Sequence, residues 1–171
     1  MRLIAITLPH IWPGEAACIS QMLDSGEYWR VHIRKPDCKP KEVANLIEGI
    51  PERLRRSLTI HYFPELAEWL GLGGVHLNAR LNGVPEGWSG LVSRSCHSLE
   101  ELSLPADYRF LSPVFDSISK PGYLSAFTEE DLRGHVDADT FALGGVTPDK
   151  LELLEQLGFG GAAMLGAAWK K

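Results

Sequence analysis

Short runs of β-branched and other apolar residues recur along the chain, and stretches whose apolar residues have helical spacing separate several of them. Eight runs are predicted to be strands: Leu3–Thr7, Tyr28–Arg34, Ser57–His61, Gly74–Asn78, Leu91–Ser95, Tyr108–Val114, Thr140–Val146 and Gly161–Gly166. Six stretches are predicted to be helices: Glu15–Ser25, Lys41–Ile50, Pro64–Leu70, Leu99–Leu104, Thr128–His135 and Pro148–Leu157. Strands that alternate with helices pair in parallel through right-handed crossovers, so the pattern predicts an α/β fold.

Residues that start and stop helices agree with these boundaries. Asp131 follows Thr128 by three residues, which is the spacing of a capping box. Glycines stand just beyond three of the predicted helices, at Gly26, Gly71 and Gly158. We therefore expect helix ends close to these positions.

Eight strands with intervening helices predict a compact (β/α)8 TIM barrel that occupies residues 1–171 as a single domain. Such barrels typically have ~250 residues, so a chain of 171 requires shortened outer helices. The segment Ala79–Trp88 is too rich in glycine and proline for a helix, and five residues follow Gly166, so the fourth and eighth helices are expected to be reduced. An open doubly wound sheet is the alternative architecture. A strand face without its helix needs a cover, and we expect a second copy of the chain to provide it, in a homodimer.

Composition narrows the classes of partner. Lys and Arg total 17 and Asp and Glu total 22, a net charge of -5, which argues against nucleic acid because phosphate backbones bind basic surfaces. No apolar run approaches the ~20 residues of a membrane span, and Met1–Thr7 lacks the residue order of a signal peptide. The 3 cysteines are odd in number and lack metal-ligand spacing. We expect a reduced protein of the cytoplasm with neither membrane nor nucleic-acid partners.

Four histidines, His32, His61, His76 and His97, lie at or just beyond the ends of consecutive predicted strands. Alternation along a strand places His32 on one face with Arg34, and His76 on one face with Asn78. In a barrel this polar face turns inward near the C-terminal mouth, where substrates bind. A hydrogen-bonded structural role is the alternative for each histidine. A metal site made of all four is a further alternative, but these strand ends carry no Asp or Glu, and we expect no metal.

The seventh and eighth strands end in small residues, Gly144-Gly145 and Gly166-Ala167. In barrels of this kind the loops after these two strands commonly bind phosphate through backbone N–H groups. Lys120, in the long loop after the sixth strand, and Arg34 would add positive charge to such a site. The alternatives are a tight turn for the glycines and solvated surface charges for Lys120 and Arg34.

Cys96 and His97 are neighbours in sequence and could suggest a nucleophile with its base. Adjacent residues of a strand point to opposite faces, so these two side chains cannot easily share a proton. Cys96 is predicted to be a small buried hydrophobic residue.

Taken together, several segments resemble the family of thiamine phosphate synthases and thiazole tautomerases. The segments that carry the resemblance are His32–Lys35, Gly74–Leu77, Ser95–Glu101, Asp107–Phe115, Lys120 and Gly144-Gly145. The resemblance extends over nearly the whole chain. It implies a (β/α)8 barrel, a role in thiamine biosynthesis, and a thiazole phosphate ligand whose phosphate lies at the glycine ends of strands seven and eight.

The synthase branch of this family holds magnesium on two aspartates. The resemblance places the first, with the asparagine before it, at His61-Tyr62 and the second at Leu81, so both carboxylates are missing. Imidazole, phenol and isobutyl groups do not bind Mg²⁺, which prefers hard anionic oxygen. A lysine of the synthase falls on Pro36, and Lys35 is shifted by one residue, which starts it on the wrong face for a diphosphate.

The tautomerase branch resembles this chain in His32-Ile33-Arg34 and in the run Ser95–Glu101. The histidine of that run is the branch's acid and base, so the resemblance implies this role for His97. Moving a double bond into an aromatic thiazole requires the removal of one proton and the delivery of another. An imidazole does both near neutral pH without a metal.

Three functions follow from these observations. The first is a metal-independent thiazole tautomerase, an isomerase with His97 as catalytic residue and no cofactor. Its substrate- and phosphate-binding residues are predicted to be Arg34, His32, His76, Ser95, Lys120, Gly144, Gly145, Gly166 and Ala167. The second is a thiamine phosphate synthase, a transferase that would need Mg²⁺. The third is a barrel without catalysis that binds thiazole phosphate or a partner protein.

Overall fold

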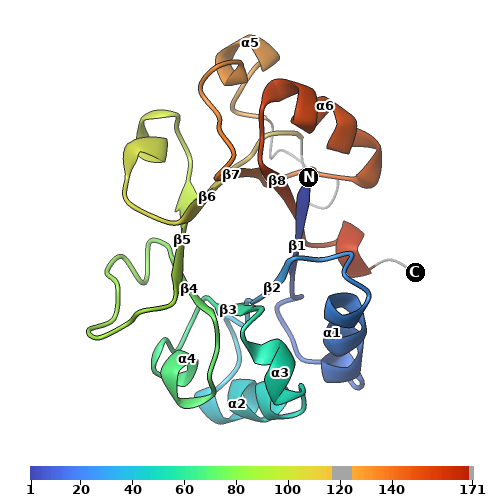
Figure 1. Cartoon of the computed structure of the whole chain (residues 1–171), viewed down its shortest axis with the longest axis vertical. Helices are drawn as coiled ribbons and strands as arrows, with labels where there is room; N and C mark the ends of the chain where they lie inside the picture. Colours follow the sequence, from blue (N-terminus) through green and yellow to red (C-terminus); the bar gives the residue numbers. More distant parts are fainter. Residues whose placement is uncertain (117–124, 170–171) are drawn as a thin grey trace. The chain divides into compact units, whose positions relative to one another are not determined.

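The computed structural model describes residues 1–116 and 125–169. Eight strands close into a barrel in chain order, and every register in the described pairings is parallel (Figure 1). The strands are β1 (Arg2–Ile6), β2 (Arg30–Ile33), β3 (Leu58–Ile60), β4 (Gly74–Leu77), β5 (Leu91–Cys96), β6 (Tyr108–Leu111), β7 (Thr140–Ala142) and β8 (Gly161–Met164). Each predicted strand is confirmed within a few residues. The open sheet is wrong, because the strand order closes on itself.

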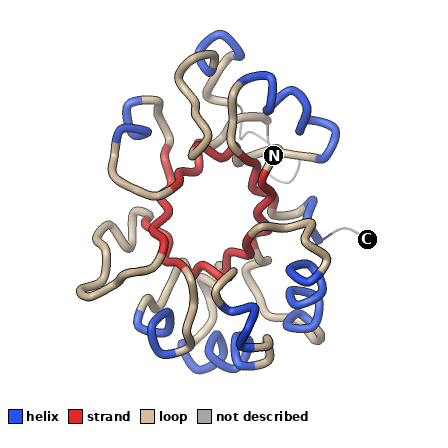
Figure 2. The backbone as a smooth tube through the Cα atoms, in the orientation of Figure 1, coloured by secondary structure: helices blue, strands red, loops and turns tan. Residues whose placement is uncertain are grey.

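The helices lie outside the strands (Figure 2). They are α1 (Glu15–Asp24), α2 (Pro40–Glu48), α3 (Glu52–Arg55), α4 (Glu65–Trp69), α5 (Glu129–Leu132) and α6 (Leu151–Leu157), with 3₁₀ turns η1 (Glu100–Ser103), η2 (Pro148–Lys150) and η3 (Ala167–Trp169). The sequence did not predict α3, because a four-residue helix is too short to show an apolar period. The Thr128 capping box is confirmed, and Gly158 caps α6 with a left-handed φ of 101°.

The reduced fourth helix is confirmed, since residues 78–90 between β4 and β5 contain no helix. After β8 only the short turn η3 is described. The second copy of the chain expected to cover the exposed strand face stays a prediction. None of the helices in the described residues combines the length and apolar character needed to cross a membrane.

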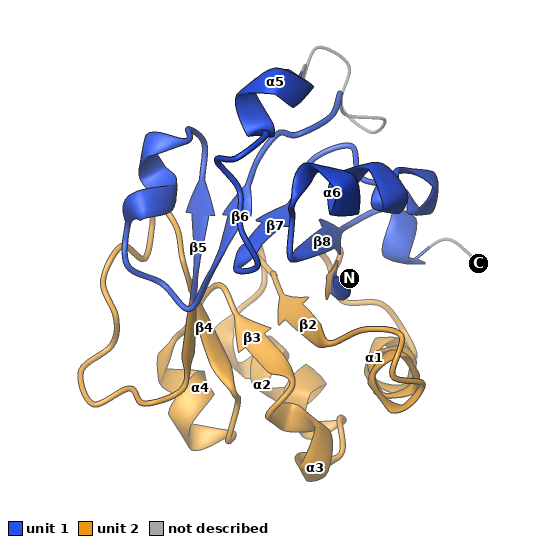
Figure 3. Ribbon diagram, turned by 45° about the horizontal axis from the view of Figure 1, so that its top comes forward, with its two compact units in different colours: residues 1–4, 93–171 blue, residues 5–92 orange. Residues whose placement is uncertain are grey.

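Two compact units divide the chain, one of Met1–Ile4 with Ser93–Lys171 and one of Ala5–Val92 (Figure 3). In the unit of Ala5–Val92, β3 pairs with β2 and with β4. One face of these strands is apolar and buried. The other face carries the buried polar residues Arg30, His32, Thr59, His61 and His76. Strand alternation thus separates an apolar side from a polar side within one sheet.

Arg30 is a buried cation in this polar layer, and only 4% of it is exposed. Its Nε donates to Thr59 Oγ1 at 3.0 Å, and its Nη2 donates to the carbonyl of Leu58 at 2.9 Å. A Cβ on Gly74 would lie 2.5 Å from Thr59 Oγ1 and 3.2 Å from Arg30 Nη2. The glycine that starts β4 therefore makes room for the Thr59 hydroxyl, which accepts from the guanidinium of Arg30.

An aromatic cluster fills the corresponding layer in the other unit. The ring centroids of Tyr108 and Phe141 are 5.4 Å apart, and those of Phe110 and Phe141 are 6.3 Å apart. Gly161 is paired with Phe141 across the β7–β8 register, and a Cβ there would lie 2.1 Å from the Phe141 ring. A glycine at the start of a strand again makes room for a large neighbour.

A buried ion pair joins the first residue of α1 to the chain just beyond β2. Lys35 Nζ lies 2.6 Å from Glu15 Oε1, and the two side chains are 1% and 0% exposed. Lys35 Nζ also donates to the carbonyls of Leu8 and His10, both at 2.8 Å. Burial lowers the pKa of Lys35, and the Glu15 carboxylate acts in the opposite direction.

Removing one member of this pair should destabilise the fold strongly, because the other charge stays buried without its partner. We expect Glu15→Gln or Lys35→Met to lower the free energy of unfolding by about 3–5 kcal/mol, measured by urea denaturation. The matched control is Asp24→Asn, which breaks the exposed pair of Asp24 with Arg53. Exposed pairs contribute little, so this variant should unfold close to wild type. Equal losses in the two sets would contradict a structural role for the buried pair.

Candidate functional site

Three of the four predicted histidines come together in the unit of Ala5–Val92. His32 and His76 lie in β2 and β4, His61 directly follows β3, and the three are 0%, 1% and 6% exposed. His32 Nδ1 and His61 Nε2 are 2.8 Å apart and share a hydrogen bond. The rings of His61 and His76 stack with centroids 4.0 Å apart, and those of His32 and His76 are 5.5 Å apart. The predicted shared face is confirmed for this histidine cluster, defined as His32, His61 and His76.

Two rings of the cluster, His32 and His61, are neutral near neutral pH. Burial lowers the pKa of His32 and of His61 well below the usual imidazole value, because a charged ring in the protein interior lacks the hydration that stabilises it in water. The neighbouring ring of His76 disfavours a second charge and lowers both pKa values further, as do Arg30 at His32, and His32 and Arg34 at His61. Each neutral ring therefore carries one N–H and one lone pair.

Arg34 follows β2 and is half-buried. Its backbone N–H donates to Thr7 Oγ1 at 2.9 Å, which fixes the chain at the end of the strand. Within the described ranges no acceptor binds its guanidinium group, so the charge is available to an anion. Lys35 is not available, because its ammonium is held by Glu15 and two carbonyls. This burial of the ammonium agrees with the predicted position of Lys35, which is one residue away from that of the synthase lysine and therefore on another face.

His97 directly follows β5 in the other unit and is exposed. Its backbone N–H donates to Glu101 Oε2 at 2.5 Å, and its Nδ1 lies 3.0 Å from the carbonyl oxygen of Ser112. A carbonyl only accepts, so Nδ1 carries the proton and Nε2 holds the lone pair in the neutral ring. Ser95, two residues earlier in β5, is half-buried. The sequence did not identify Glu101 or Ser112 as supports of His97, since a contact with a backbone carbonyl leaves no residue-type signal.

Cys96 is confirmed as a buried residue that does not act with His97. It is 0% exposed, and its Sγ donates to the carbonyl of Glu101 at 3.4 Å. Burial raises the pKa of the Cys96 thiol to about 11. The thiolate needed by a nucleophile is therefore scarce at neutral pH.

The glycines after β7 form a left-handed turn against the loop that follows β6. Gly144 and Gly145 have φ angles of 90° and 63°. A Cβ on Gly144 would lie 2.8 Å from Pro113 Cα, and one on Gly145 would lie 2.3 Å from the carbonyl oxygen of Asp116. Phe115 N–H donates to the carbonyl of Gly144 at 3.0 Å. The tight turn considered for these glycines is therefore present.

The same turn leaves backbone donors available. In the part of the chain that the structure describes, the N–H groups of Gly144, Gly145, Gly166 and Ala167 donate to no protein acceptor. Because β7 and β8 are parallel neighbours, these donors lie at the same end of the two strands. Binding of a phosphate by these four N–H groups stays a prediction. Lys120, the other predicted phosphate contact, lies outside the described residues.

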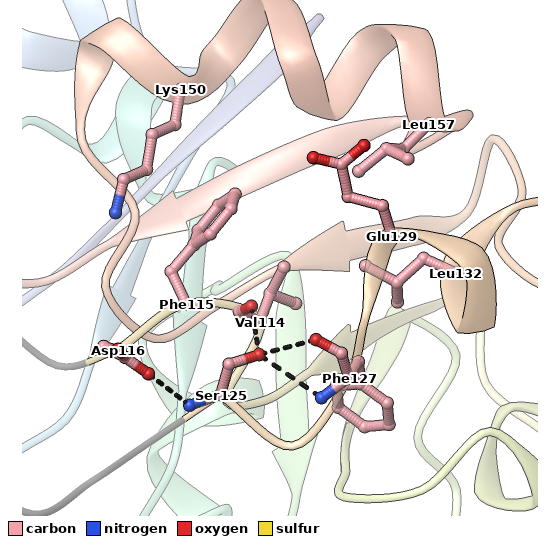
Figure 4. A pocket seen from close by; sticks show the side chains of 9 residues that line it. All are labelled: Val114, Phe115, Asp116, Ser125, Phe127, Glu129, Leu132, Lys150 and Leu157. Carbon is pink, nitrogen blue, oxygen red and sulfur yellow. Dashed lines mark hydrogen bonds between the residues drawn. The ribbon is translucent and has the colours of Figure 1, made fainter.

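Lys150 is a cation at this turn that the sequence did not single out. Its Nζ donates to the carbonyl of Gly145 at 2.8 Å and lies 4.3 Å from the centre of the Phe115 ring. It borders a cavity of about 310 Å³ between the loop after β6 and helices α5 and α6 (Figure 4). The lining residues are Val114, Phe115, Asp116, Ser125, Phe127, Glu129, Leu132, Lys150 and Leu157. In the sequence, a lysine at the start of a helix cannot be distinguished from an ordinary solvated charge. The contacts of Lys150 in the fold identify it as part of this turn.

Comparisons with known proteins agree with the observed fold. The family model for thiamine monophosphate synthase matches residues 3–168. A thiamine-phosphate synthase from Lactococcus lactis is 26% identical over 136 residues, which cover 72% of this chain but only 63% of that protein.

Two solved structures have the same fold. One is a thiamine phosphate pyrophosphorylase from Bacteroides thetaiotaomicron, with 36% identity, a TM-score of 0.87, and coverage of 99% of this chain and 85% of that one. The other is a thiamine phosphate pyrophosphorylase from Pyrococcus furiosus, with a TM-score of 0.72 and coverage of 97% and 86%. At 20% identity it is evidence for the fold alone.

The histidine cluster should make stability depend on pH. Unfolded imidazoles titrate at about 6.5, whereas His32 and His61 resist protonation in the fold. Below that pH the unfolded chain binds more protons, so the free energy of unfolding should fall as pH falls from about 6.5 to 5, by roughly 1–3 kcal/mol per pH unit.

Urea denaturation with a chelator present measures this slope. His61→Gln should flatten it, whereas His135→Gln, which replaces an exposed histidine, should not. A slope unaffected by His61→Gln would show that other groups carry the dependence.

Proposed function

Because this chain belongs to the thiamine monophosphate synthase family, we propose that it is a thiazole tautomerase that acts on a phosphorylated thiazole carboxylate in thiamine biosynthesis. The observation that carries this proposal is the geometry of His97. Its Nδ1–H is held by the Ser112 carbonyl at 3.0 Å, which leaves Nε2 as the nitrogen that exchanges protons. The ring is exposed and can reach a bound ligand.

The reaction needs one group that takes a proton and returns it. His97 Nε2 removes a proton from a ring carbon of the thiazole and becomes an imidazolium. The Nδ1–H donates to the Ser112 carbonyl throughout, which orients the charged ring and stabilises it. The same proton returns at the other end of the shifted double bond. No net proton is gained or lost, and this step requires no metal.

The phosphate of the substrate would be bound by the turns after β7 and β8. Four backbone N–H groups there, those of Gly144, Gly145, Gly166 and Ala167, are available to it. Lys150 adds a positive charge beside the turn after β7, because its ammonium donates a hydrogen bond to the carbonyl of Gly145. The other predicted substrate contacts stay predictions; they are Ser95, His32, His76, Arg34 and Lys120.

A thiamine phosphate synthase remains the second candidate, because the related proteins named above carry that activity in their names. That reaction needs Mg²⁺, and the donors of this chain do not fit the ion. In the described residues, the one group of three His, Cys, Asp or Glu side chains close enough to share a metal consists of histidines alone. Mg²⁺ prefers carboxylate and water oxygen in octahedral geometry. This favours the tautomerase.

Replacement of His97 tests the proposed role. We expect His97→Ala to lower kcat for aromatisation of the phosphorylated thiazole carboxylate by about 10²–10⁴-fold, with little change in the unfolding midpoint because the side chain is exposed. The pH profile of kcat should lose the limb due to an imidazole. His135→Gln is the control and should keep full activity. A fully active His97→Ala enzyme would overturn the assignment.

A paired assay separates the three functions. The chain is incubated with the thiazole carboxylate phosphate, or with thiazole phosphate plus pyrimidine diphosphate, each with and without Mg²⁺. We expect aromatisation that is insensitive to Mg²⁺ and no release of pyrophosphate. Mg²⁺-dependent pyrophosphate release would identify a synthase. Tight binding of thiazole phosphate without turnover in either assay would identify a barrel that only binds its ligand.

A further inference from the structure

The histidine cluster is not used by the proton transfer proposed above, although it brings three ligand groups together. We propose that His32, His61 and His76 bind one divalent ion of the late first-row transition metals, with Zn²⁺ as the expected ion. This site goes beyond the proposed tautomerase activity. It is defined by binding of metal and not by turnover, so either proposal can fail without the other.

The geometry of the cluster is close to that of a three-histidine site. One nitrogen from each ring lies within 4.8 Å of the others, and His32 Nδ1 and His61 Nε2 are 2.8 Å apart. Zinc bound at ~2.0–2.1 Å in a tetrahedral site separates its ligand nitrogens by ~3.3 Å. The closest pair must therefore open by about 0.5 Å and the widest close by about 1.5 Å. The rings of His61 and His76 must also turn out of their stack, so that the in-plane lone pairs of both can meet one ion.

The hydrogen bonding of the cluster changes when a metal binds. Its rings are buried, and an imidazole ligates a metal through the lone pair of a nitrogen without a proton. One N–H now lies between His32 and His61. When a metal binds both nitrogens, this proton leaves the bonded pair, either for the second nitrogen of its own ring or for solvent.

The donor set selects the ion. Neutral imidazoles bind Zn²⁺ and its neighbours in the periodic table, whereas Mg²⁺ and Ca²⁺ prefer oxygen. Three protein ligands leave a fourth position for water or another small ligand. Arg30 and Arg34 raise the positive potential at the cluster. We therefore expect an anionic oxygen, such as hydroxide, in the fourth position.

The test uses the full chain, stripped with a chelator and titrated with ZnCl2 by calorimetry and with CoCl2 by visible absorption. We expect one equivalent of metal per chain, a Co²⁺ spectrum typical of four- or five-coordination, and a higher unfolding midpoint at saturating Zn²⁺. The alternative is a hydrogen-bonded histidine core that binds no metal. In that case the titrations show no stoichiometric binding, and the proposal fails.

Variants identify the ligands. His61→Gln and His76→Gln should weaken metal binding by ~100-fold or more and abolish the rise of the unfolding midpoint. His135→Gln and His10→Gln replace exposed histidines and should change neither. If His135→Gln or His10→Gln removes the bound equivalent, the metal sits on the surface and the proposal is overturned.

X-ray absorption of the wild-type zinc complex keeps the test independent of whether the variants fold. It should show three imidazole nitrogens at ~2.0–2.1 Å and no sulfur. A shell with sulfur, or with fewer than three imidazoles, would contradict the site.

Discussion

Polar groups that face the inside of a closed barrel have little access to water, so each needs a partner from the protein. The unit of Ala5–Val92 is organised by this requirement. The guanidinium of Arg30 is bound by backbone carbonyls and by Thr59, and Gly74 stands where a Cβ would collide with Thr59 Oγ1. Two residues further along β2, His32 shares a hydrogen bond with His61. The glycine at the start of β4 thus makes room for the β3 side chain that binds the charge carried by β2.

The other unit largely avoids this requirement, because aromatic rings fill its interior layer. Phe110 and Phe141 are fully buried, and Tyr108 is almost so. Its polar chemistry lies at the strand ends, where His97 and the glycine turn remain partly or fully open to solvent. The histidines of the two units therefore differ in their access to solvent: the His97 ring is exposed, whereas the His32 ring is fully buried.

Strand positions and the shared face of the histidines were predictable, because both depend on local alternation and on the ends of apolar runs. His32 and His76 have apolar neighbours on both sides, which is enough to assign their face. Contacts between distant segments were not predictable. The pair of Lys35 with Glu15 depends on how α1 returns to the strand, and nothing in the local pattern distinguishes these residues from solvated charges. The tautomer of His97 likewise depends on a backbone carbonyl that any residue at position 112 would supply.

The buried polar layer of β2, β3 and β4 holds imidazoles and no carboxylate among its described side chains, which limits the ions that it can bind. A buried aspartate near Arg30 would be ionised and would attract a hard cation, which in turn binds a diphosphate. Imidazoles in the same place are neutral, so this layer keeps the positive charge of Arg30 and offers nitrogen in place of anionic oxygen. With Lys35 held by Glu15, the segment after β2 contributes Arg34 as its cation available to a ligand. These features disfavour a magnesium diphosphate, while the turn at Gly144 and Gly145 has backbone N–H groups without a protein acceptor in the described residues. They support the proposal made above, in which a monophosphorylated ring reacts by proton transfer.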